Sequence, residues 1–566
     1  MVEGMRGRIG RRDVFAIAVL GLIGVGIPLW LSAAAGAIGL PGNDDWVYMR
    51  GADSLYRTGS IDMPGHTAAA IGQVVLVQPL LWVSGGDPWA FTAFGLVMAL
   101  IGIAATYLLA RRFVGTGSAV LVALLVIVFP GFGRLAGSFM TDVPAYALVM
   151  LCLLLGTRWL QGDGGRATLV ASIVAGLLAV SIREFAFAAP VAILAAAWAR
   201  NRADERAWLA AITGIFVVGA GWILVASAGT PGSGGPPAPP DLVRLSLLGP
   251  AFATLAAVLL PVTILGMGRR MGALSTGQVI LGAGLVCLVV IVPGGPLLGN
   301  LWMSTGLGGD YFLSGSRDAV IGERAWALSG QLAAFAAILA AALALSWGRR
   351  RLAPVGSPST NRAHAIRIAR SRQAPLILFL ATYAAELVVF TWVGTMIDRY
   401  LFPMVPAAAI LLLWGLDQPA RAGRSRAFSQ AALAWLAVSA FVIAANSFAY
   451  DAARWRAGEA AVGMGYDART VDAGLDWVGY HTGGIGNSGQ GTYDVTWYDD
   501  RLMSARPCAV LSNSPLDDPS FRLVHVDRAA YGQYLFFGPA QPFYLYGSLA
   551  DGCPQPPATA TYAPTP

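Results

Sequence analysis

Long apolar runs separated by short polar stretches dominate the pattern of this chain. Many of the runs are about 17 to 25 residues long, which is the length that a helix needs to cross the hydrocarbon core of a bilayer. We therefore expect a mainly α-helical, polytopic membrane protein with about thirteen transmembrane helices. The predicted spans are residues 14–38, 88–110, 117–131, 143–157, 168–182, 185–199, 207–229, 245–268, 277–295, 326–347, 374–393, 401–416 and 430–449.

Two of the predicted spans are short and meet at the sequence SIRE, residues 181–184. The sequence is compatible either with two helices or with one broken helix. The choice matters because each span carries the chain to the other side of the membrane. One helix fewer would reverse the predicted side of every later loop.

The placement of arginine favours the odd number of spans. Lys and Arg together number 38, and all of them are arginine. With the N-terminus in the cytoplasm, the loops on that side hold 23 of the 38, the opposite loops hold 8, and the region after the last span holds 7. The positive-inside rule describes this distribution. We therefore expect a multi-pass protein of the plasma membrane with a cytoplasmic N-terminus and an extracytoplasmic C-terminal region.

The charge of the chain also indicates which kinds of molecule it binds. The net charge of +7 follows from the predicted topology, so we do not interpret it as a site for nucleic acid. The basic cytoplasmic loop at 348–373 suits the anionic headgroups of membrane lipids. Only 12% of the residues are charged, about half of the fraction that a soluble protein carries.

The polar stretches divide the chain into three regions. Residues 1–449 form the predicted transmembrane domain, with an external loop at 39–87. Residues 450–553 mix helical and alternating segments and are numerous enough for a small extracytoplasmic α/β domain. Residues 554–566 are rich in Pro, Thr and Ala, so we expect them to be disordered.

The four cysteines fall into two groups. Cys152 and Cys287 lie in predicted spans, whereas Cys508 and Cys553 both lie in the C-terminal region. An oxidising compartment would let the second pair form a disulfide. The alternative is a pair of free, buried thiols.

Charged residues cluster at the outer ends of several predicted spans. After the first span, the stretch NDDWVYMRGADSLYRTG brings an adjacent acidic pair, two aromatic residues and an arginine within eight positions. Further charges stand at the start of the fourth span, in the SIRE junction and just before the twelfth span. The candidate residues are Asp44, Asp45, Trp46, Tyr48, Arg50, Asp142, Arg183, Glu184, Asp398, Arg399 and Tyr400.

Each of these features has an ordinary explanation when it is taken alone. The acidic pair can be solvated loop carboxylates, Asp142 can be a helix cap before Pro144, and Arg183 and Glu184 can form an ion pair. Trp46 and Tyr48 can be interfacial anchors. Charges at membrane depth are costly, however, and they tend to be functional. Together they predict an external cavity in which carboxylates suit a general base and arginines suit a phosphate.

Metal chemistry has little support from the sequence. The four histidines are scattered, without paired ligand spacing, at His66, His364, His481 and His525. Asp44 and Asp45 are the only candidates for a carboxylate-bound Mg²⁺ or Ca²⁺, and this alternative stays open. No nucleotide-binding motif is visible, so we expect no cofactor apart from such an ion.

These motifs resemble those of membrane glycosyltransferases with the GT-C fold, in the branch of the protein O-mannosyltransferases and aminoarabinose transferases. DDWVY at 44–48 is similar to the Asp-Glu-x-x-Tyr motif of that branch, with Asp45 where glutamate is usual. MTDVPAY at 140–146 resembles its second acidic motif, and RYLFP at 399–403 resembles its late Arg-Tyr-x-x-Pro element. An odd number of spans followed by an external domain also matches this branch.

The resemblance implies a function. Similar enzymes take a sugar from a polyprenyl-phosphate carrier and pass it, with inversion at the anomeric carbon, to a glycan, lipid or protein outside the cytoplasm. Asp44 would then be the general base, while Asp45 would fix the loop or bind a divalent ion. Asp142 would hold sugar or acceptor hydroxyls or orient an arginine. Arg183, or else Arg399, would meet the lipid phosphate.

The residues near these motifs complete the expected site. Glu184, Tyr400 and Arg50 are expected to line it, and Trp46 and Tyr48 would form a wall on which a sugar stacks.

Two other classes of function remain. A lipid or sugar transporter or flippase would also be polytopic with buried charges, but it should show internal repeats and charges near the midplane. A non-catalytic scaffold of envelope assembly would use the C-terminal region for docking and would tolerate the loss of Asp44. The charges at the outer helix ends favour the glycosyltransferase.

Overall fold

The computed structural model describes most of the chain. The described residues are 9–63, 70–200, 205–228, 242–267, 297–300, 302, 323–351, 370–393, 396–414, 423–482, 503, 506–527, 542–556 and 561–562. The predicted span at 277–295, most of the basic loop at 348–373, and His66 and His364 lie outside them.

Helices make up most of the described chain. Those before residue 230 are α1 (Arg11–Gly21), η2 (Leu22–Gly26), α2 (Ile27–Ala35), α3 (Asp45–Thr58), α4 (Ile71–Leu76), α5 (Gln78–Ser84), α6 (Trp89–Arg111), α7 (Thr116–Ile127), α8 (Phe132–Ala136), α9 (Asp142–Leu160), α10 (Arg166–Val180), η3 (Glu184–Phe187), α11 (Ala188–Arg200) and α12 (Arg206–Ala228). The later ones are η5 (Leu242–Leu247), α13 (Leu248–Val258), α14 (Leu260–Met267), α16 (Glu323–Arg351), α18 (Ala374–Val393), η7 (Asp398–Leu401), α19 (Met404–Trp414), α20 (Gly423–Gly463), η8 (Ala468–Thr470) and α21 (Leu475–Thr482).

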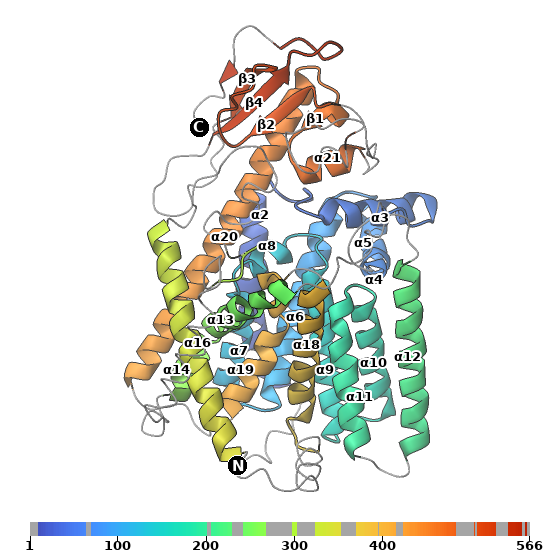
Figure 1. Ribbon diagram of the computed structural model, residues 1–566. Coiled ribbons are helices and arrows are strands. Elements are labelled where there is room, and N and C mark those ends of the chain that lie inside the picture. Colours follow the sequence, from blue (N-terminus) through green and yellow to red (C-terminus); the bar gives the residue numbers. More distant parts are fainter. Residues whose placement is uncertain are drawn as a thin grey trace.

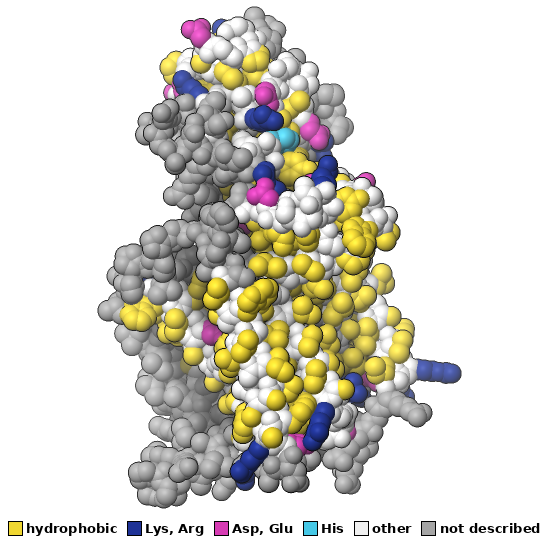
Figure 2. Space-filling model, turned by 90° about the vertical axis from the view of Figure 1, so that its right-hand side faces the viewer, with side chains coloured by type: hydrophobic (Ala, Val, Ile, Leu, Met, Phe, Trp, Pro, Cys, Tyr) yellow, Lys and Arg dark blue, Asp and Glu magenta, His cyan; other side chains and the backbone are white. Residues whose placement is uncertain are grey.

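The helices form a bundle with a small sheet beyond one end. Figure 1 shows α9, α10, α11, α12 and α18 standing side by side, while α3 lies across the end of the bundle that faces the sheet. On the face drawn in Figure 2, a broad band of hydrophobic side chains covers the bundle, and most charged side chains lie above or below this band. The arrangement is that of a multi-pass membrane protein.

The described residues hold fewer full-length spans than the sequence predicts for the whole chain. Among the described residues, 7 helices are long and apolar enough to cross a membrane, or 8 if a bent pair counts as one span. The bent pair joins α13 and α14 at 68°, close to Pro261, which has no N–H to donate and whose ring clashes with the preceding turn. Helices α7, α10, α11 and α19 occupy predicted spans but are shorter than a full crossing. Thirteen spans are therefore not confirmed.

The SIRE junction separates two helices. Helix α10 ends at Val180, and Arg183 is extended before the short η3 turn. A Cβ atom added at Gly176 of α10 would lie 2.9 Å from Cβ of Pro190 in α11. Such close packing fourteen positions apart requires the chain to fold back, so α10 and α11 lie beside each other.

The last long helix passes through the predicted domain boundary at residue 449. Helix α20 runs without a break for 41 residues, from Gly423 to Gly463. Its second half contains Ala, Arg and Glu, which favour helix, and no proline. The helix therefore carries the chain directly from the bundle to the sheet.

The C-terminal sheet has five strands in the order β1-β2-β4-β3-β5. They are β1 (Val471–Asp472), β2 (Ala509–Ser512), β3 (Phe521–Asp527), β4 (Phe543–Ser548) and β5 (Thr561–Tyr562). β1 pairs with β2 and β5 pairs with β3 in parallel, while β4 is antiparallel to both of its neighbours. Within the segment 554–566, for which we predict disorder, Thr561 and Tyr562 of β5 pair with the edge of β3.

A disulfide joins Cys508 and Cys553, whose Cα atoms are 5.3 Å apart. In a variant that lacks Cys152 and Cys287, reduction should raise the count of reactive thiols by two, because only this pair is left to be released. The measurement is thiol titration of denatured protein with and without reductant. Two free thiols in exported, unreduced protein would contradict the bridge.

The sidedness that we predict from the arginine distribution has its own test. Single cysteine tags placed within 350–370 should react with an impermeant maleimide only in inside-out vesicles, because this arginine-rich loop is predicted to be cytoplasmic. Tags near residue 480 should react only in intact cells. Labelling of both positions from one side would overturn the predicted topology.

Candidate active site

The acidic pair lies where the chain turns from the first span into α3. Gly36 ends α2 in a left-handed conformation, with φ of 75°, and Asn43 has a φ of 66°. Asp44 occupies the cap position of α3 and Asp45 its first turn. Asp44 is half-buried, whereas Asp45 is only 1% exposed. The two neighbouring carboxylates therefore have different environments.

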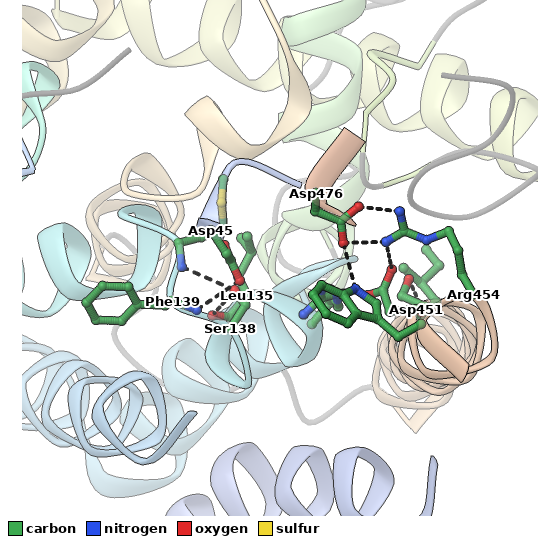
Figure 3. Close-up of polar contacts among 12 residues, drawn as sticks. Asp45, Leu135, Ser138, Phe139, Asp451, Arg454 and Asp476 are labelled. Carbon is green, nitrogen blue, oxygen red and sulfur yellow. Dashed lines mark hydrogen bonds and ion pairs between the residues drawn. The ribbon is translucent and has the colours of Figure 1, made fainter. Parts of the chain in front are cut away.

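Asp45 points into the protein and binds the turn between α8 and α9. Its Oδ2 accepts a hydrogen bond of 3.1 Å from the backbone N–H of Phe139, as Figure 3 shows. Burial raises the pKa of the Asp45 carboxyl to about 8, although Arg134 and the Phe139 N–H act in the opposite direction. A carboxyl that keeps its proton near neutral pH is a poor base there, so this geometry favours a positioning role for Asp45.

A second cluster of charges forms around Asp142, in the first turn of α9. Nη1 of Arg183 lies 3.4 Å from Oδ2 of Asp142, and Nη1 of Arg399 lies 3.6 Å from the same oxygen. Arg183 also donates to the hydroxyl of Thr141. Residues far apart in the sequence, at the start of α9, in the SIRE junction and in η7, thus meet at one carboxylate.

The cluster borders a small cavity of about 20 Å³. Five of its twelve lining residues are aromatic, namely Tyr146, Phe185, Tyr383, Tyr400 and Phe402. The Arg183 guanidinium lies 5.2 Å from the centre of the Tyr400 ring, within cation–π range. The hydroxyl of Tyr383 donates to the carbonyl oxygen of Tyr400 at 2.9 Å. The cavity therefore combines two guanidinium groups with aromatic surface.

The start of α3 lies within electrostatic range of this cluster. Burial alone would lower the pKa of the Arg399 guanidinium. Asp142, Tyr400 and Asp44 act in the opposite direction, and the net effect is a pKa above the usual value. Tyr48 is 1% exposed, and it acts in the same direction on Arg183, as does half-buried Glu184. The first acidic motif and the arginine cluster thus belong to one charged region.

Two of the predicted residues have other partners. Arg50 forms an ion pair of 2.8 Å with Asp62 on the exposed side of α3. Trp46 is 3% exposed and packs on Gly479, where an added Cβ would collide with the indole ring. Trp46 therefore attaches α3 to α21 rather than forming an open wall.

Two buried residues near the acidic pair have no place in the predicted site. Nη2 of Arg134, in α8, lies 2.6 Å from Oδ2 of Asp451, in α20. Arg134 is 3% exposed and Asp451 is 8% exposed. Arg134 stands just after the predicted span 117–131 and Asp451 just after the predicted span 430–449, but neither belongs to a motif from which the site was predicted.

The surroundings of the acidic pair offer few further metal ligands among the described residues. Within the described part of the chain, no three His, Cys, Asp or Glu side chains gather as metal ligands would. Oδ1 of Asp45 is buried and has no hydrogen-bond partner among the described residues. It suits an ion in this respect, but the positive charge of Arg134 acts on the same carboxyl.

Comparisons with known proteins agree with the motifs. The sequence profile of the family described as "Dolichyl-phosphate-mannose-protein mannosyltransferase" matches residues 76–225, which include Arg134, Asp142 and Arg183. No curated protein matches the chain.

Solved structures that match the chain include the following two. ArnT from Cupriavidus metallidurans, bound to undecaprenyl phosphate, is 13% identical, with 96% of this chain and 98% of that chain covered and a TM-score of 0.39. The oligosaccharyltransferase AglB from Archaeoglobus fulgidus, in complex with an inhibitory peptide and a dolichol-phosphate, is 14% identical. It covers 88% of this chain and 64% of its own, with a TM-score of 0.43. The profile match over residues 76–225 agrees with the resemblance drawn from the motifs: this part of the chain is similar to the mannosyltransferase family.

Proposed function

We propose that this protein is a GT-C enzyme that transfers a sugar from a polyprenyl-phosphate carrier to an acceptor outside the cytoplasm, with inversion at the anomeric carbon. The observation that carries the proposal is the convergence of Arg183 and Arg399 on Asp142 beside the cavity. The description of the matched family, which names a dolichyl-phosphate-linked sugar, supports this class of donor.

The arginine pair has the chemistry that a phosphate requires. A guanidinium offers five N–H donors in a fixed fork that matches phosphate oxygens. Nε of Arg399 is buried and, among the described residues, has no hydrogen-bond partner. An orphaned donor of this kind points to an acceptor that arrives with a ligand. We assign the lipid phosphate to Arg183 first and to Arg399 second.

Asp44 is the residue best placed to act as the base. It is half-buried at the cap of α3, whereas Asp45 is committed to Phe139. Asp44 accepts the proton of the attacking hydroxyl as its oxygen bonds to the anomeric carbon from the face opposite the phosphate. The bond from this carbon to the phosphate oxygen breaks, and the arginines stabilise the charge that the lipid phosphate gains.

A divalent ion is not needed for this sequence of events. If one binds, Asp44 and Oδ1 of Asp45 would hold it, and its charge would help to stabilise the leaving phosphate. The steps assigned above to Asp44 and the arginines use only side chains of this protein.

The test is release of the carrier. Purified protein in vesicles is given a panel of undecaprenyl-phosphate hexoses and pentoses, together with envelope lipids and glycans as acceptors. Undecaprenyl phosphate should be released from at least one donor, and the sugar should appear with the opposite anomeric configuration. Binding of every donor without release, or movement of intact donor across the bilayer, would favour the transporter instead.

A further inference from the structure

Four alternating charges form a buried chain between the bundle and the C-terminal region. Figure 3 shows its outer half, in which Arg454 faces Asp476 through both nitrogens of its guanidinium. We call this set the charge chain; its members are Arg134, Asp451, Arg454 and Asp476. All four are buried, with at most 8% of each residue exposed.

The links of the charge chain come from three helices. Arg134 of α8 meets Asp451 of α20 at 2.6 Å, and the other oxygen of Asp451 lies 3.5 Å from Nη2 of Arg454, one turn further along. Arg454 then forms a bidentate pair with Asp476 of α21. Bidentate contacts of this kind fix orientation as well as distance. The chain therefore holds α8, α20 and α21 in one relative position.

The inner end of the charge chain rests on the backbone beside the acidic pair. A Cβ added at Gly42 would collide with Nη2 of Arg134 and would lie 3.0 Å from Oδ2 of Asp451. The guanidinium of Arg134 would have to shift to admit this methyl group, and it is held by its ion pair with Asp451 and by the Phe448 ring, whose centre is 5.3 Å away. Gly42 is two positions before Asp44, so the glycine lets the ion pair pack directly on the segment that aims this carboxylate.

The outer end of the charge chain reaches α3 by a second route. Asp476 lies in the first turn of α21, which also carries Gly479, and Gly479 packs on Trp46. Asp476 is fully buried and also accepts a hydrogen bond of 3.2 Å from Nε1 of Trp455. The N-terminal end of α3 is thus held from two sides by elements that the charge chain joins.

We infer that Arg134 is a positioning residue for Asp44, and that the charge chain transmits the placement of the C-terminal region to the acidic pair through Gly42. The inference rests on the proposed function of Asp44. Arg134 itself does not meet the substrate in this assignment; it fixes the backbone from which the base projects. A displacement of about 1 Å at a catalytic group can cost about 100-fold in rate.

The experiment compares variants that disturb only this contact. Arg134→Met removes the positive charge, whereas Arg134→Lys keeps the charge but lacks the planar set of N–H donors. Gly42→Ala inserts a methyl group where the guanidinium packs. Gly214→Ala is the matched control, because nothing lies within 4 Å of the methyl group that it adds in α12. Each protein is measured for donor turnover, undecaprenyl phosphate binding and thermal unfolding.

A positioning role predicts a split between turnover and binding. Arg134→Met and Gly42→Ala should lower kcat by at least about tenfold, because a shift of even part of 1 Å is costly. Binding of undecaprenyl phosphate should stay within about twofold, since Arg183 and Arg399 are untouched. Arg134→Lys should recover part of kcat, and Gly214→Ala should behave as wild type.

Two outcomes would overturn the inference. One is wild-type kcat in both Gly42→Ala and Arg134→Met. The other is an equal loss of turnover, lipid binding and thermal stability, which would describe a merely structural contact. If Arg134→Met does not fold, Gly42→Ala and Arg134→Lys decide between the same outcomes.

A second measurement, hydrogen exchange, tests the inference even if the proposed function is wrong. If wild-type protein transfers no sugar, hydrogen exchange of the backbone at residues 41–48 still reports the contact. Exchange there should be faster in Gly42→Ala than in Gly214→Ala, while exchange in α9 and η3 stays unchanged. Equal exchange at 41–48 would remove the positioning role independently of activity.

Discussion

Asp44→Asn should lower sugar transfer by at least about 100-fold while the protein still folds and binds undecaprenyl phosphate. The substitution keeps the size of the side chain but removes its ability to take a proton, and general-base contributions are typically about 10² to 10⁴-fold. The measurement is release of undecaprenyl phosphate in vesicles, together with binding of the lipid alone. Lipid binding should be preserved, because the arginines that meet the phosphate lie on other elements.

Asp53→Asn is the matched control for this variant. Asp53 lies on the same helix but is paired with Arg57 on the exposed side. Its loss should leave turnover near the wild-type value. Asp45→Asn should cost less than Asp44→Asn unless a metal is held there, in which case added Mg²⁺ or Ca²⁺ should restore part of the activity. Near-normal transfer by Asp44→Asn would return the acidic pair to the role of an ordinary helix end.

Arg183→Ala should weaken lipid phosphate binding as well as turnover. A hydrogen bond to a charged group is worth about 1.5 to 3 kcal/mol, so binding should fall by about 10- to 100-fold. The loss should appear in both quantities because the guanidinium meets the phosphate before and during bond breaking. Titration with undecaprenyl phosphate measures the first effect, and carrier release at saturating donor measures the second.

Two further substitutions make the result specific. Arg183→Lys keeps the charge but lacks the planar fork, so it should recover part of the binding. Arg57→Ala removes an arginine that is mostly exposed and should have no effect on either quantity. Unchanged lipid binding in Arg183→Ala would remove this residue from the phosphate site and leave Arg399 as the candidate.

The sequence predicts the charged cavity because its residues stand next to span boundaries. Asp142 begins α9, Arg183 separates α10 from η3, and Arg399 lies in the turn before α19. The hydropathy of the sequence marks such boundaries directly, so the charged residues beside them can be recognised without a structure. The same signal placed the helices correctly over most described spans, but it could not show that Pro261 bends one predicted span into α13 and α14.

The charge chain lies beyond what this kind of reasoning can find. Arg134 and Asp451 are more than three hundred positions apart, and nothing in the local pattern says that α8 lies beside α20. Arg50 is the opposite case, because it stands close to the motif in sequence but pairs with Asp62. Prediction from proximity along the chain therefore includes a residue of α3 that pairs elsewhere, and it misses residues that reach the site only through tertiary packing.

The unbroken course of α20 has a consequence for the acceptor. At about 1.5 Å per residue, this helix is about 60 Å long, roughly twice the thickness of the hydrocarbon core. The helix holds the sheet at a fixed distance from the membrane, and its buried ion pairs with α8 and α21 restrict its tilt. If Asp44 is the base, as we propose, its distance from the sheet is then fixed, and acceptors should be selected by their width.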